Sequence, residues 1–245
     1  MAIIGGRAHS IKHVKEIVDL GYPFAEICLY DPDKVMEEME DFIDIKQNND
    51  INYLAHYPNE GSPSDPDILR KKYLPKMKKL IDFSAELNIK KGTIHYWMDK
   101  RWAKPSLIND KLEILEELVQ YATSQDVIIC IENLSEQYDS FKTAIDMIPD
   151  LRITLDIGHG QLLSDENTSF DFVKHLFNKI EHVHVHDNFG GTSVKDDLHL
   201  PLGEGKVDYP KIFTMLKDKG YDSTITMEVK PNDMPKTKKR IERYI

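Results

Sequence analysis

Residues 180–205 read IEHVHVHDNFGGTSVKDDLHLPLGEG and hold four of the ten histidines in the chain. His182, His184 and His186 alternate, and alternation places side chains on one face of a β-strand. Further acids and a histidine follow before a Gly-Glu-Gly turn (Asp187, Asp197, His199). So many imidazoles and carboxylates in one stretch predict a divalent metal site. The alternative is a strand with a polar inner face and a solvated loop, which suits a single histidine better than the whole set.

The composition narrows the class of protein. A length of 245 residues fits two domains or one α/β barrel. The net charge of −10 argues against a general polyanion-binding surface, although it leaves room for a local basic groove. Cys28 and Cys130 lie in apolar runs and are expected to be buried thiols in a reducing compartment. No apolar run approaches the ~18 residues of a membrane span, and the first residues are too soon polar for a signal peptide. We therefore expect a soluble cytoplasmic protein.

Short apolar runs alternate with amphipathic segments along the whole chain. The expected strands are residues 3–5, 24–30, 51–57, 92–97, 127–134, 152–157, 180–186 and 224–229. The expected helices are residues 11–20, 33–47, 68–87, 106–124, 140–148, 170–178, 210–219 and 235–245, with a break near Leu74 because Pro75 follows it. Eight such units predict a single-domain (β/α)8 barrel over residues 1–245. An open doubly wound sheet is the alternative, but Gly5-Gly6-Arg7 is too short for its phosphate loop.

Candidate ligands follow six consecutive strands of this predicted barrel. Active sites in such barrels lie at the carboxyl ends of the strands, so side chains there share one rim. These side chains are His56, His95, Glu132, Asp156 with His159, His184 or His186, and Glu228, while Asp197 and His199 lie on the loop after the seventh strand. Buried charges require a partner or a metal. The chain has only six arginines, and of these only Arg7 lies near a strand end, so ion pairing does not account for the acids.

Several motifs resemble the xylose isomerase-like TIM barrel superfamily. They are IENL (131–134), LDIGH (155–159), VHVHD (183–187), DLHLPLGEG (197–205) and MEVK (227–230), and GYPFAEI (21–27) is similar to that superfamily's opening pattern. The resemblance implies a common metal site of Glu132, Asp156, His184 and Glu228. Counting back from Asp197 in the superfamily's pattern favours His184 rather than His186 as the metal ligand. His186 would then lie beside the metal and contact substrate. His182 lies deeper and is expected to be a core residue.

The endonuclease IV branch of the superfamily resembles the sequence further. Its additional ligands match His56, His95, His159, Asp197 and His199, which completes a set of nine for three zinc ions. The loops differ, because residues 57–62 and 96–99 lack that branch's DNA-entry pattern, and residues 31–33 are acidic. Lys100, Arg101 and Lys104 with Trp97 and Trp102 form a basic and aromatic patch. That patch suits a base, a sugar ring or a phosphate, or is simply a solvated loop.

The resemblance therefore implies two enzymatic functions. In the first, a metal-dependent isomerase or epimerase acts on a small sugar or sugar phosphate, with Glu132 and Glu228 passing a proton through an enediolate. Its substrate contacts would come from Arg7, Trp97, His186, Lys206 and Lys230. In the second, clustered metals hydrolyse a phosphoester, and only this function would involve DNA. A barrel that binds sugar without turnover is a third possibility. The imidazoles favour zinc or manganese, with one to three ions per chain.

Overall fold

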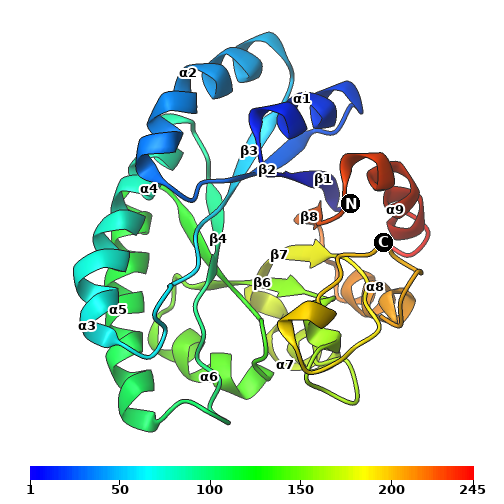
Figure 1. Cartoon of the computed structure of the whole chain (residues 1–245). Helices are drawn as coiled ribbons and strands as arrows, with labels where there is room; N and C mark the ends of the chain where they lie inside the picture. Colours follow the sequence, from blue (N-terminus) through cyan, green and yellow to red (C-terminus); the bar gives the residue numbers. More distant parts are fainter.

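The computed structural model describes residues 1–245 and shows eight parallel strands closed into a barrel in chain order (Figure 1). The strands are β1 (Ile3–Ala8), β2 (Phe24–Cys28), β3 (Asn52–His56), β4 (Lys91–His95), β5 (Ile128–Glu132), β6 (Arg152–Asp156), β7 (Ile180–Val185) and β8 (Thr224–Met227). β1 closes the barrel by pairing with β2 on one side and β8 on the other. The predicted single-domain (β/α)8 barrel is confirmed.

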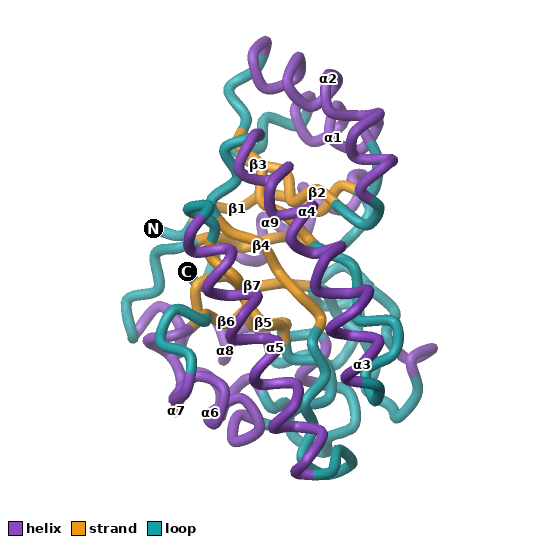
Figure 2. Tube along the Cα trace, turned by 90° about the vertical axis from the view of Figure 1, so that its left-hand side faces the viewer, coloured by secondary structure: helices purple, strands orange, loops and turns teal.

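A helical segment follows each strand, and these segments lie on the outside of the barrel (Figures 1 and 2). The helices are α1 (Ile11–Asp19), α2 (Pro32–Asn48), α3 (Pro66–Ile68), α4 (Leu74–Glu86), α5 (Pro105–Ser124), α6 (Tyr138–Met147), α7 (Ser169–Leu176), α8 (Tyr209–Asp218) and α9 (Met234–Ile241). Their apolar stripes pack on the outer face of the strands to form one continuous core. No helix combines the length and the apolar character that crossing a membrane requires.

The helical segment after β3 changes its geometry near Leu74, where Pro75 predicts a break, but it does not end there. One turn of α3 continues into a π-helical segment (Leu69–Tyr73), and α4 starts at Leu74, directly before the proline. Proline has no N–H to donate and its ring crowds the preceding turn, so a locally wider turn accommodates it within an unbroken helical path. This segment still buries Leu69, Met77 and Leu80 against the barrel.

Several boundaries differ from the predicted ranges, and those of β1 and β8 matter for the site. β1 runs to Ala8 rather than Gly5, because Gly6, Arg7 and Ala8 pair with β2. This longer strand carries Arg7 into the barrel mouth. β8 ends at Met227, so Glu228 is the first residue beyond the strand. Both cysteines are free, and only Cys130 is fully buried.

Candidate metal centre

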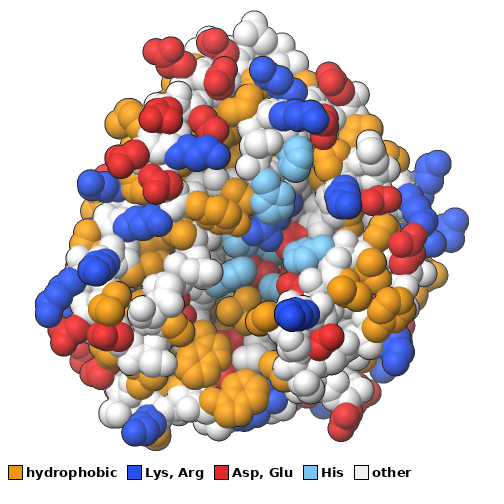
Figure 3. Space-filling view, in the orientation of Figure 1, with side chains coloured by type: hydrophobic (Ala, Val, Ile, Leu, Met, Phe, Trp, Pro, Cys, Tyr) orange, Lys and Arg blue, Asp and Glu red, His pale blue; other side chains and the backbone are white.

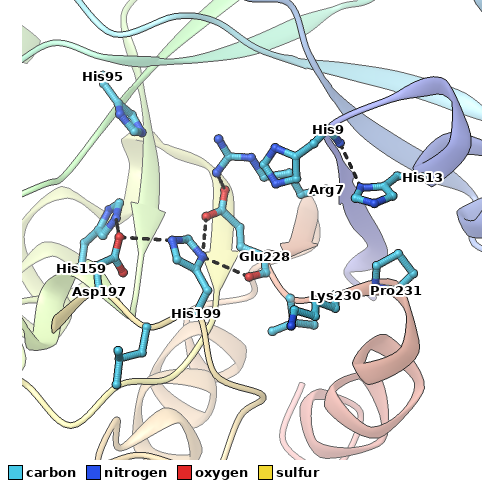
Figure 4. Close-up of a pocket in the computed structure, with 12 residues that line it drawn as sticks. Arg7, His9, His13, His95, His159, Asp197, His199, Glu228, Lys230 and Pro231 are labelled. Atoms are coloured by element: carbon cyan, nitrogen blue, oxygen red, sulfur yellow. Dashed lines mark hydrogen bonds and ion pairs between the residues drawn. The ribbon is translucent and has the colours of Figure 1, made fainter. Parts of the chain in front are cut away.

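The strand-end side chains converge at the carboxyl rim around a cavity of about 380 Å³. Figure 3 shows histidines gathered around the central hollow with acidic side chains at its floor. Figure 4 shows Arg7, His95, His159, Asp197, His199 and Glu228 directed toward this cavity from different strands and loops. Six consecutive strands from β3 to β8, together with the loop after β7, therefore contribute to one site.

Strand register aligns the ligands. His95 is the neighbour of Glu132 across β4 and β5, and Asp156 is the neighbour of His184 across β6 and β7. Asn133 ties β5 to β6, because its side-chain amide exchanges two hydrogen bonds with the backbone of Asp156, at 2.9 and 2.8 Å. The carboxylates are consequently fixed by backbone pairing rather than by flexible loops.

The first cluster consists of His56, Glu132, His184 and Glu228, all buried, with one donor atom of each within 4.8 Å of the others. Glu132 lies at its centre. Its Oε1 is 3.1 Å from His184 Nδ1, and its Oε2 is 2.9 Å from His95 Nε2. Burial alone would raise the pKa of the Glu132 carboxyl, but His184 and His95 hold that pKa well below its usual range. Glu132 is therefore an ionised carboxylate ringed by imidazoles.

The second cluster consists of His159, His186, Asp197 and His199. Asp197 Oδ2 is 3.1 Å from His199 Nε2 and 3.3 Å from His159 Nε2, while its Oδ1 is 3.6 Å from His186 Nε2. Asp156 links the clusters. Its Oδ1 is 3.2 Å from His186 Nε2, and one of its carboxylate oxygens lies within 4.8 Å of the metal-ligand atoms of Glu132 and His159. The two clusters form one continuous polar site.

The loop after β7 is folded back by Asp187, which places Asp197 and His199 over the barrel. The Asp187 carboxylate accepts the backbone N–H groups of Gly203, at 2.7 Å, and Val207, at 3.0 Å. Gly203 has a φ of +77°, and a Cβ on Gly205 would lie 2.2 Å from a backbone oxygen. These contacts explain why both glycines are needed in the PLGEG segment.

Buried polar atoms without hydrogen-bond partners test whether a metal suits the site. They include Oε2 of Glu132 and of Glu228, Oδ2 of Asp156, Oδ1 of Asp197, Nε2 of His56 and of His95, and both ring nitrogens of His186. Some of these atoms lie close together, as Glu132 Oε2 and His95 Nε2 do at 2.9 Å, but without the geometry of a hydrogen bond. Buried polar atoms are nearly always hydrogen-bonded, so such a concentration needs an explanation. Mixed imidazole and carboxylate donors directed at one space suit a divalent cation such as zinc or manganese. The donor set therefore fits the metal that the sequence predicts.

Glu26 on β2 is a functional side chain that we did not single out from the sequence. Both of its carboxylate oxygens contact His184 Nε2, at 2.9 and 3.0 Å, and one contacts His182 Nε2 at 3.1 Å. This contact leaves His184 Nδ1 facing Glu132 and Glu228, each at 3.1 Å. A carboxylate on the far nitrogen orients a metal-binding imidazole and strengthens it as a ligand. His182 lies deeper and also contacts Thr224.

The proposed substrate contacts lie in different places. Arg7 forms a buried ion pair with Glu228 and donates to Tyr30 Oη at 2.8 Å. Lys230 lines the cavity, and Trp97 lines an adjoining one, whereas His186 belongs to the second cluster. Lys206 is exposed and lines neither cavity, because its backbone is tied to Asn188 in the folded-back loop. His9 and His13 line the mouth, and nothing in the sequence around them marked this position.

Comparisons with known proteins agree with this architecture. A D-tagatose 3-epimerase-like protein has a TM-score of 0.82 and 24% identity, and the match covers 99% of this chain and 96% of that one. D-allulose 3-epimerase from Methylomonas sp. has a TM-score of 0.81 and 16% identity, over 100% and 98%. The IOLI protein, solved with a zinc atom, has a TM-score of 0.82 and 15% identity, over 100% and 99%. The sequence model of the xylose isomerase-like TIM barrel family matches residues 14–244 of this chain. The chain belongs to the xylose isomerase-like TIM barrel family.

Proposed function

We propose that the protein is a metal-dependent isomerase or epimerase of a small sugar or sugar phosphate. One observation carries the proposal: the Glu132 and Glu228 carboxylates both lie 3.1 Å from His184 Nδ1, and each has a buried oxygen that makes no hydrogen bond. Glu228 lines the cavity and Glu132 is buried in the same cluster, so the two carboxylates can serve as the acid and base of one proton transfer. Sugar epimerases and epimerase-like proteins among the structural neighbours support the same reaction class.

Glu132, Asp156, His184 and Glu228 would hold the metal, as the resemblance implies. When bound, a divalent cation would polarise a carbonyl and stabilise negative charge on its oxygen. Glu132 would remove the proton from the carbon beside the carbonyl, leaving an enediolate. Glu228, ionised at rest, would take a proton from solvent and pass it to the other face, while the proton on Glu132 leaves to solvent. Burial would raise the pKa of Glu228, but Arg7 lowers that pKa well below its usual range and keeps the carboxylate ionised.

Proton exchange tests this function directly. We expect metal-loaded protein to exchange a carbon-bound hydrogen of at least one ketose or ketose phosphate with D2O, detected by loss of the corresponding proton NMR signal. Exchange should disappear after the metal is removed by chelation and return when zinc or manganese is added. If no substrate in a broad ketose panel exchanges in the loaded protein, the proposal loses its support.

The second cluster favours a second candidate function, phosphoester hydrolysis by a multinuclear site. The loop expected to contact nucleic acid is less basic than its sequence suggests. Arg101 pairs with Asp99, whose Oδ2 lies 2.7 Å from the guanidinium, and Lys100 donates to the Asp139 carbonyl. The rim therefore suits DNA poorly, and small phosphoesters are the substrates that we propose for this second function.

The activity of a variant that lacks the second metal site separates the two functions. We expect metal-free protein titrated with zinc to bind two ions. The Asp197→Asn variant should bind one, because Asp197 contacts only histidines of the second cluster. Asp218→Asn, at an exposed position on α8, is the matched control and should bind two. Under the isomerase proposal Asp197→Asn retains proton exchange. Loss of exchange in that variant together with phosphoesterase activity in the wild type would favour hydrolysis.

A further inference from the structure

A second cavity of about 470 Å³ opens beside the metal centre. It shares His95, His159 and Asp197 with the first cavity, so the two adjoin at these side chains. Unlike the first, its remaining wall is largely apolar and includes Trp97, Trp102, Leu134, Leu162, Leu163 and Val194. Figure 3 shows hydrophobic side chains along one side of the histidine-lined hollow. Each cavity alone is within the roughly 300–1,000 Å³ of a small-molecule site.

Trp102 provides a flat aromatic surface in this cavity. It is 55% exposed, and the Arg101 guanidinium lies 4.4 Å from its ring centroid. Arg101 is itself held by Asp99, through Nη2 to Oδ2 at 2.7 Å and Nε to Oδ1 at 3.0 Å, and Asp99 also accepts the Ser135 hydroxyl at 2.9 Å. The guanidinium therefore supports the ring while its charge is neutralised locally.

The loop between β4 and α5 that carries both tryptophans is fixed by two buried carboxylates. Glu60 accepts the backbone N–H of Trp97 at 2.5 Å, and Glu136 accepts that of Met98 at 2.8 Å. Both acids are at least 93% buried, with exposures of 7% and 1%. A loop held in this way presents its aromatic side chains without an ordering cost on binding.

Val194 and Leu163, which also line this cavity, lie outside the buried core. Val194 is 92% exposed on a 3-10 turn (Val194–Asp196), and reciprocal capping contacts between Ser193 and Asp196 hold that turn. Leu163 has a φ of +54°, and its backbone N–H donates to Gly191 at 2.8 Å, which fixes its position on the rim. A leucine in this conformation and an exposed valine facing a tryptophan-lined cavity are features of a binding surface rather than of packing.

We propose that this second cavity binds a planar apolar group covalently attached to the reacting sugar. The substrate would then be a conjugate with an aromatic aglycone whose sugar ring keeps a free carbonyl group, rather than a free monosaccharide. This inference rests on the proposed function, which assigns the sugar to the metal centre. Hydroxyl groups would lose water against the apolar wall without gaining partners, whereas an aromatic ring stacks on Trp102 and gains by burial. The shared residues place the junction of the two parts at the second metal cluster.

The test compares two probes on zinc-loaded protein by calorimetry: phenyl β-D-glucopyranoside and methyl β-D-glucopyranoside. We expect the phenyl glycoside to bind about tenfold tighter, as a stacked and buried aromatic ring predicts. Trp102→Ala should reduce that ratio to within about twofold without changing methyl glycoside affinity. Phe189→Ala is the matched control, because Phe189 is 54% exposed on the same rim but lines neither cavity, and it should keep the full ratio.

Val194→Asp gives an independent variant, because a side chain this exposed does not affect folding. Placing a charge on the apolar wall should also abolish the phenyl preference. Equal binding of both probes to the wild type, or a preference that survives both substitutions, would overturn the inference. Proton exchange on free ketoses is measured separately, so a failed aglycone preference with intact exchange refutes only this cavity's role. A phenyl preference without any exchange refutes only the reaction.

Discussion

The Glu132→Gln variant is expected to lose proton exchange by a factor of about 10²–10⁴, the contribution typical of a positioned acid or base. The glutamine side chain has the same shape but cannot accept the proton. Glu132 also contacts imidazoles from four different elements, which depend on its negative charge (His56, His95, His159, His184). The measurement is the exchange rate in D2O at saturating zinc, with bound metal determined on the same sample.

Glu181→Gln is the matched control for this substitution. Glu181 lies on β7 near the amino ends of the strands, where it pairs with Lys91 at 3.0 Å, far along the barrel from the site. It should retain full exchange and full metal content. Glu132→Asp adds a second comparison, because the shorter aspartate side chain keeps the negative charge but places it one methylene farther from the site. Unchanged exchange in Glu132→Gln with metal still bound would exclude Glu132 as the base.

The Lys111→Met variant is expected to lose about 3–5 kcal/mol of unfolding free energy, the usual effect of breaking a buried ion pair by removing one partner. Lys111 is fully buried on α5, contacts the Glu60 carboxylate, and lies 4.4 Å from the ring centroid of Tyr96. Burial lowers the pKa of Lys111 and raises that of Glu60, so each group depends on the other to stay charged. Urea denaturation provides the measurement.

Lys78→Met provides the comparison for this pair. Lys78 bridges α4 to Glu117 on α5 at 2.8 Å, but both side chains are partly exposed, so its loss should be within about 1 kcal/mol. The double variant Lys111→Met with Glu60→Gln should recover much of the stability, because no uncompensated charge remains and Gln can still accept the Trp97 N–H. If Lys111→Met is no more damaging than Lys78→Met, the pair does not stabilise the fold as argued.

The barrel and the rim residues could be predicted because both depend on short patterns within the sequence. Each strand is a short apolar run ended by its polar ligand, and parallel strands bring those ends to one side. The alternation at residues 182–186 likewise fixes which histidines face inward. His184 and Glu228 could therefore be placed in one site although 44 residues separate them, the difference between 228 and 184.

The remaining features depend on contacts that only the closed barrel defines. Glu26 looks like an ordinary strand acid until β2 lies across the interior from β7 and its carboxylate meets His184. His186 joins a cluster because Asp187 folds the following loop back over it. Lys206 was expected near substrate, but that same folding leaves it outside both cavities. Arg101 looked available for a ligand, yet Asp99 two residues earlier occupies it.

The pairing of β1 with β8 has a consequence for folding kinetics. It joins Ile3 to Thr224 and brings Arg7 to Glu228 across 221 residues of chain, so the last strand made must find the first. Contacts this distant form late, because the loop entropy of closure precedes any gain from them. Glu228 reaches His184 by a different contact, the pairing of β8 with β7, which is close in sequence. Metal captured by the full ligand set would thus report that β8 has joined β7, whereas the Arg7–Glu228 pair would report closure of the barrel, and nascent chains lacking β8 would bind metal only through partial sets of ligands.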